Sequence, residues 1–197
     1  MYLNLKDIYS KSWNIFAKSW WQYVLFSLIM MLILIIPFGS ILQTLLALLM
    51  FNAVLLFIKN GSISFSDFFK FKEVLNTNSI LLIVIIACFY ALLEILGFSV
   101  LYTIFAIVYF ILSIILFPLF CVVIDKQLSF KEAILYSAKL TKNIRIEILL
   151  IMIINLIIGL IGALIFLVGV FVAIPIVSIA TVLVYKELEK KSSVENI

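Results

Sequence analysis

Long apolar stretches alternate with three polar segments along this chain. The polar segments cover residues 3–18, 60–76 and 124–141, and the last of them is the longest polar interruption. In the first segment, apolar and aromatic residues recur at steps of three or four: Tyr2, Leu5, Tyr9, Trp13, Phe16 and Trp20. This spacing predicts a helix with one apolar face and lysines opposite, which is typical of helices at a membrane surface.

The apolar stretches predict six membrane spans, because about twenty apolar residues cross roughly 30 Å of hydrocarbon. The expected spans are 20–36, 41–58, 79–96, 100–124, a fifth from Ile146 and a sixth that ends near Tyr185. Pro118 predicts a kink near the end of the fourth span. No polar turn separates the last two spans, so one long span with a re-entrant piece is the alternative.

The composition supports this prediction, because 66% of the 197 residues are apolar and only 12% are charged. Soluble domains are about half apolar and about a quarter charged. We therefore expect an all-α, polytopic helical membrane protein. Its six transmembrane helices form three hairpins, each preceded by a short cytoplasmic amphipathic helix, and residues 1–197 form a single integral membrane domain.

The basic residues indicate which side of the membrane each segment faces. All 14 Lys and Arg fall in the segments 1–19, 59–78, 125–145 and 186–191, and the three intervening turns have none. Loops rich in Lys and Arg stay on the cytoplasmic side. The pattern predicts a multi-pass protein of the cytoplasmic membrane with both termini inside.

The three polar segments also share a helix-start pattern. Each has a residue suited to an N-cap and, three places later, an acid that can bond back to the cap. The pairs are Asn4 with Asp7, Ser64 with Asp67, and Ser129 with Glu132. Their spacing predicts an internal repeat with units 1–59, 60–124 and 125–197.

The third polar segment and the spans after it carry a resemblance to a known family. The residues concerned are Ile124-Asp125, Leu128-Ser129, Lys131-Glu132-Ala133, Ser137, Leu140-Thr141-Lys142, Gly159, Gly162 and Ile174-Pro175. Over residues 116–186 the chain resembles a broad group of uncharacterised bacterial integral membrane proteins. These include the membrane domain found with some glycerophosphodiester phosphodiesterases. The resemblance implies a multi-span helical module and no phosphodiesterase activity, because that catalytic domain is a separate soluble barrel.

Few residues offer chemistry. Histidine is absent, and Cys88 and Cys121 lie within apolar runs, where we expect small buried side chains. We predict no catalytic residue, no cofactor and no metal site. The candidate intramembrane polar residues are Asn52, Asn155, Glu94 and Glu147. Glu94 is expected at the outer headgroups, with an ion or proton site as the alternative, and Glu147 in an interfacial ion pair with Arg145.

Asn52 and Asn155 both fall near the middle of their predicted spans. An amide that faces lipid leaves its donors and acceptors unpaired, so we expect both side chains to bond to neighbouring helices inside the bundle. The alternative is that they line a wet pocket at the membrane midplane, where carriers place their sites. Gly159 and Gly162 are not spaced as GxxxG and favour turn flexibility over close helix packing.

Two function classes follow from these patterns. The first is a non-enzymatic scaffold, assembly or protective module of the cytoplasmic membrane, and the second is a small carrier or channel for a solute, ion or lipid. The lack of catalytic residues and of strong intramembrane charges favours the first. The expected partners are the lipid bilayer and other membrane proteins or a second copy of the chain, and nucleic acid is not expected.

Overall fold

The computed structural model describes residues 3–33, 39–96, 100–126, 128–165 and 169–195, and within these ranges the chain is helical with no strands. The helices in chain order are α1 (Leu5–Lys18), α2 (Trp20–Ile33), α3 (Gly39–Asn60), the 3₁₀ helix η1 (Phe65–Phe69), α4 (Phe71–Val74), α5 (Thr77–Leu96), α6 (Val100–Ile115), α7 (Leu119–Asp125), α8 (Phe130–Thr141), α9 (Arg145–Leu164) and α10 (Val170–Glu195). The all-α prediction is confirmed for this part of the chain.

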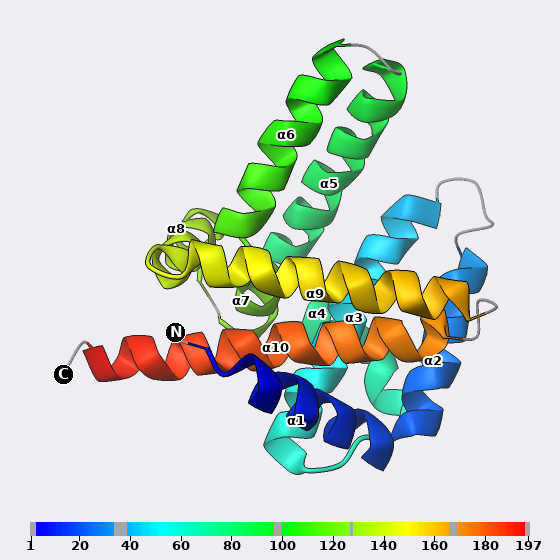
Figure 1. Ribbon diagram of the computed structural model, residues 1–197. Coiled ribbons are helices and arrows are strands. Elements are labelled where there is room, and N and C mark those ends of the chain that lie inside the picture. Colours follow the sequence, from blue (N-terminus) through cyan, green and yellow to red (C-terminus); the bar gives the residue numbers. More distant parts are fainter. Residues whose placement is uncertain (1–2, 34–38, 97–99, 127, 166–168, 196–197) are drawn as a thin grey trace.

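Helix α10 is the centre of the molecule, because α1, α2, α3, α8 and α9 all contact it. Figure 1 shows α9 and α10 side by side along most of their length. A Cβ atom on Gly162 of α9 would lie 2.9 Å from the Cβ of Ala173 and 2.9 Å from the carbonyl oxygen of Gly169. Gly162 therefore permits close helix packing, and the interpretation as turn flexibility is wrong for this glycine. A Cβ on Gly159 would meet nothing within 4 Å.

Helix α1 lies next to α10 (Figure 1) and is also bonded to α9. The N–H of Leu3 donates to Glu147 at the start of α9, and the hydroxyl of Tyr9 donates to Asn155 two turns further along. The two contacts advance in the same direction, so α1 and α9 run parallel. The predicted apolar face is confirmed only in part, because Phe16 is buried but Trp13 and Trp20 are 55% and 54% exposed. The buried face is formed by Ile8, Ser12 and Phe16, and Tyr2 lies outside the described residues.

The predicted second surface helix is not one helix. It begins after Ser64 as predicted, but forms the short η1 and then α4. The reason is aromatic packing, since Phe68 is fully buried and stacks on Phe26 with ring centroids 4.7 Å apart. The other two segments begin at Leu5 and Phe130, so all three predicted helix starts are confirmed.

The capping pattern is complete in two of the three segments. The N–H of Ser64 donates to Asp67 at 2.7 Å, and the N–H of Ser129 donates to Glu132 at 2.9 Å. Bonds from the cap residue lower the pKa of both acids below the ordinary value. The largest cause is the N–H of Ser64 for Asp67 and the hydroxyl of Ser129 for Glu132. In the first segment Asn4 accepts the N–H of Asp7, whose carboxylate pairs with Lys11.

Helices α5 and α6 form a hairpin that projects from the rest of the molecule (Figure 1). The chain then bends by 50° between α6 and α7, and Pro118 is the N-cap of α7. The predicted kink is confirmed. Cys121 on α7 is buried as expected, whereas Cys88 on α5 is exposed, so that prediction is wrong for Cys88.

Three helical segments are long and apolar enough to cross a membrane: Leu42–Asn60, Arg145–Leu164 and Val170–Ser192. The number rises to five if each bent pair, α1 with α2 (93°) and α6 with α7 (50°), is one span. Among the described residues, three to five helical segments are therefore long and apolar enough to span a membrane, which is fewer than the six predicted. The predicted fifth and sixth spans are separate helices, because the chain turns back between α9 and α10.

Candidate functional site: a charged cluster beside a polar cavity

A partly polar cavity that contains a predicted site residue lies where α3, α7 and α10 meet. Its volume is about 370 Å³. The lining residues are Asn52, Leu55, Leu56, Ile58, Lys59, Ile124, Asp125 and Lys186. One predicted candidate, Asn52, thus lies with Lys59 of its own helix and with Asp125 and Lys186 from distant parts of the sequence.

Asp125 is the centre of a charged cluster at the edge of this cavity. The Tyr185 hydroxyl donates to Asp125 Oδ2 at 2.6 Å, and Lys186 Nζ lies 2.7 Å from the same oxygen. Lys186 also bonds to Glu189 Oε2 at 3.0 Å, and Lys126 forms an ion pair with Glu189. The cluster therefore links the end of α7 to the last turns of α10.

The charges of this cluster alternate in sign. Asp125 and Glu189 are each paired with lysine, and the side chains of the Asp125–Lys186 pair keep 25% and 31% of their surface exposed. The hydrogen bond and the charge of Glu189 raise the pKa of Lys126 above its ordinary value. Such an arrangement holds two helix ends together, because every charge already has an opposite partner.

Asn52 is buried in α3, with 5% of its surface exposed. Its Nδ2 donates to Glu73 Oε2 on α4 at 3.1 Å. The expectation that this amide points into the bundle and bonds to a neighbouring helix is confirmed. The bond links the short α4 to α3.

Asn155 is half-buried in α9 and bonds to α1. Its Oδ1 accepts the hydroxyl of Tyr9 at 2.8 Å, and the same hydroxyl lies 3.4 Å from the carbonyl oxygen of Ile151. The expected bond to a neighbouring helix is confirmed here too. The two asparagines do not line one common cavity. Residues of α3, α7 and α10 line the cavity beside Asn52, whereas Asn155 belongs to α9.

The two acidic candidates have different outcomes. Glu147 accepts the N–H of Leu3 at 2.8 Å, so it ties the beginning of the chain to the first turn of α9. Its predicted ion pair with Arg145 stays a prediction. Glu94 belongs to α5, and its side chain lies outside the described part of the structure.

The sequence reasoning missed the contact between Asp125 and Lys186, which are 61 positions apart. One local signal was available, because each charge directly follows a long apolar run at the predicted cytoplasmic side. The pattern predicts that both residues lie at the same level of a membrane, but it does not indicate that α7 and α10 are neighbours.

Among the residues that the structure describes, no group of three or more His, Cys, Asp or Glu side chains could hold a metal ion. Comparison of the chain with protein-family models, curated proteins and solved structures gives no match. The resemblance to the membrane domain of some glycerophosphodiester phosphodiesterases therefore stays a prediction.

Proposed function

We propose that this protein is a non-enzymatic scaffold, assembly or protective module of the cytoplasmic membrane. One observation carries the proposal: Asn52 and Asn155, the amides placed to serve a transport path, instead bond directly to Glu73 and Tyr9 on neighbouring helices. Polar groups used in this way hold helices together. The module acts through its contacts in the bilayer, with lipid, other membrane proteins or a second copy as partners.

The proposal includes six spans arranged as three hairpins, with both termini on the cytoplasmic side. Its support is the distribution of all 14 basic residues in alternate connecting segments. Single cysteines test this directly in a background that lacks Cys88 and Cys121. Ser66→Cys and Lys139→Cys, both at exposed positions, should react with a membrane-impermeant thiol reagent only after permeabilisation. Reaction of Lys139→Cys in intact cells would refute the topology.

A small carrier is the second candidate, favoured by the cavity of about 370 Å³ that Asn52 lines with Lys59, Asp125 and Lys186. A carrier must open such a cavity to each side of the membrane in turn. A scaffold leaves it open to one side only. The two functions therefore differ in the accessibility of the cavity wall.

Leu56→Cys, in the same cysteine-free background, distinguishes the candidates because Leu56 lines the cavity. Purified protein is reconstituted in one orientation, and an impermeant thiol reagent is added to either side. We expect modification from the cytoplasmic side only. Modification from both sides, with Lys139→Cys still reacting from one side, would favour the carrier over the scaffold.

A further inference from the structure

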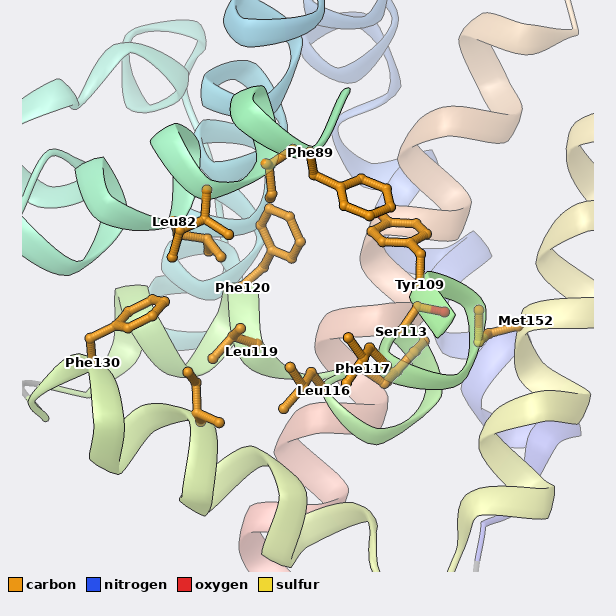
Figure 2. Close-up of a pocket in the computed structure, with 14 residues that line it drawn as sticks. Leu82, Phe89, Tyr109, Ser113, Leu116, Phe117, Leu119, Phe120, Phe130 and Met152 are labelled. Carbon is orange, nitrogen blue, oxygen red and sulfur yellow. The ribbon is translucent and has the colours of Figure 1, made fainter. Parts of the chain in front are cut away.

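A second cavity, almost entirely apolar, lies at the base of the α5–α6 hairpin (Figure 2). Its volume is about 380 Å³, within the range of roughly 300–1,000 Å³ that is usual for ligand pockets. One face of α5, from Leu82 to Phe89, forms a wall, and one face of α6, from Tyr109 to Ser113, forms the opposite wall, which Leu116 continues in the turn after α6. The lining residues of α5 follow the i, i+3, i+4, i+7 spacing of a packed seam, and those of α6 follow i, i+3, i+4. The two seams meet at Phe89 and Tyr109, and the cavity lies where they separate.

The cavity is long and has two distinct ends. At one end the rings of Phe89 and Tyr109 stack at 4.7 Å, which joins α5 to α6. At the other end Phe130 of α8 points into the space (Figure 2), and Ile134 of the same helix also lines it. From Leu82 to Phe89 is seven residues of helix, so the wall is about 10 Å long at a rise of 1.5 Å per residue.

Water is a poor occupant of this space. A buried water needs two to four polar partners, and the Ser113 hydroxyl already donates to the carbonyl oxygen of Phe110 at 2.7 Å. An empty apolar cavity lowers the stability of a protein in proportion to its volume, because the side chains that line it lose van der Waals contacts. The cavity is therefore suited to an apolar occupant.

The cavity can be entered from the apolar outer surface of the molecule. Leu82 and Leu119 form a buried floor, with 4% and 6% of their surface exposed, whereas Ile85 and Leu112 on the rim are each 46% exposed. The rim belongs to the chain's apolar exterior, and in a protein with several membrane-crossing helices this exterior meets acyl chains. On α8, the exposed Lys131 directly follows Phe130, and the exposed Lys139 is five residues beyond Ile134. Cations near such an apolar surface attract lipid phosphates.

We propose that this cavity binds one acyl chain of a membrane phospholipid. The ester end of the chain lies beside Phe130 and Ile134, near the lysines of α8. The terminal methyl group lies against the Phe89–Tyr109 pair. A bound lipid would then be part of the packed base of the α5–α6 hairpin. This adds a specific lipid site to the proposed function, which rests on contacts between helices.

Photocrosslinking in vesicles tests the proposal. The full chain is reconstituted into phosphatidylcholine and phosphatidylglycerol containing traces of a phospholipid with a diazirine either near the ester or at the chain terminus. Crosslinked peptides are then mapped by mass spectrometry. We expect the terminal probe to label Phe89 and Tyr109 and the ester-proximal probe to label Phe130 and Ile134, each above the labelling of the outward-facing Ile107.

Ile86→Trp fills the cavity from the α5 wall, and Ile80→Trp is the matched control, because Ile80 is on the same helix but does not line the cavity. We expect Ile86→Trp to lower crosslinking at the cavity residues about tenfold, since each methylene excluded from a site lowers lipid affinity. Ile80→Trp should change nothing. Ser113→Phe, from the opposite wall, gives the same test if Ile86→Trp does not fold.

Two results would overturn the proposal. One is equal labelling of inward- and outward-facing positions of α5 and α6, unchanged by either filling variant, which is the pattern of ordinary surrounding lipid. The other is a crosslink from these residues to a second copy of the chain, lost in Ile86→Trp, which would make the cavity a contact between protomers.

Discussion

Helices α6 and α10 are both strongly apolar, yet their surroundings differ. Helix α10 contacts five other helices, and none of its described large apolar side chains is exposed. Helix α6 contacts mainly α5, α8 and α9, and every residue from Ile107 to Leu112 is exposed. Exposure here does not follow hydropathy, because lipid tails are as apolar as leucine and a membrane helix has no hydrophobic reason to prefer protein over lipid.

The buried helix differs from the exposed one in its small and weakly polar residues. Ala173 and Ala180 on α10 are 5% and 0% exposed, so other helices approach its backbone closely. The hydroxyls of Ser178 and Thr181 donate to carbonyl oxygens one turn earlier in the same helix, which leaves no unpaired donor at the packed surface. Small residues thus mark the packed face of α10. Internally bonded hydroxyls occur on both helices, because Ser113 on α6 also donates within its own helix.

The largest predicted effect disrupts the packing of α10 against α9. Gly162→Leu should destabilise the protein by about 3 kcal/mol, the upper end of the usual cost of overpacking, because the new side chain meets Ala173 and the backbone of Gly169. Reversible unfolding in mixed micelles measures this. The matched control is Gly159→Leu on the same helix, where space is open. Equal stability of the two variants would show that α9 and α10 do not pack as described.

The next effect concerns the charged cluster that joins α7 to α10. Asp125→Asn should lower the free energy of unfolding by about 1.5–3 kcal/mol, the usual worth of hydrogen bonds to a charged group, because it weakens the bonds from Tyr185 and Lys186. Ser113→Ala on α6 should be close to neutral, since that hydroxyl bonds only within its own helix. A larger loss in Ser113→Ala than in Asp125→Asn would reverse the comparison of the two regions.

A smaller, local effect is expected at the start of α8, which lies beneath the α5–α6 hairpin. Ser129→Ala should destabilise the first turn of α8 by about 1 kcal/mol, the usual cost of losing an N-cap. Hydrogen exchange of the first-turn amides, including that of Glu132, reports it. Amides in the middle of α10 serve as the internal control. Faster exchange throughout the molecule would mean that α8 supports the whole fold instead.

The smallest effect is the pH dependence of the same cap. The pKa of Glu132 is lowered in the folded protein, so its contribution to stability is complete above the ordinary pKa of a glutamate and is lost as the pH falls through the lowered value. NMR titration should place Glu132 below that ordinary value. In Ser129→Ala its pKa should rise, because the serine hydroxyl is the largest cause of the shift. An unchanged titration in the variant would contradict the cap.

The sequence by itself determined the helices and many of their ends. Apolar length predicted the segments that became α3, α9 and α10, and three N-cap residues predicted the helix starts at Leu5, Phe65 and Phe130. These features are local, because a capping bond spans three residues and a proline acts on the turn that precedes it. The bend at Pro118 follows for the same reason.

Only the tertiary structure decided which helices are neighbours. Nothing local shows that Asp125 meets Lys186, that α1 is bonded to α9, or that Gly162 is packed while Gly159 is open. The physical reason is that burial in lipid and burial in protein select the same apolar side chains. The sequence therefore records which residues avoid water, and the arrangement of the helices decides which of them touch each other.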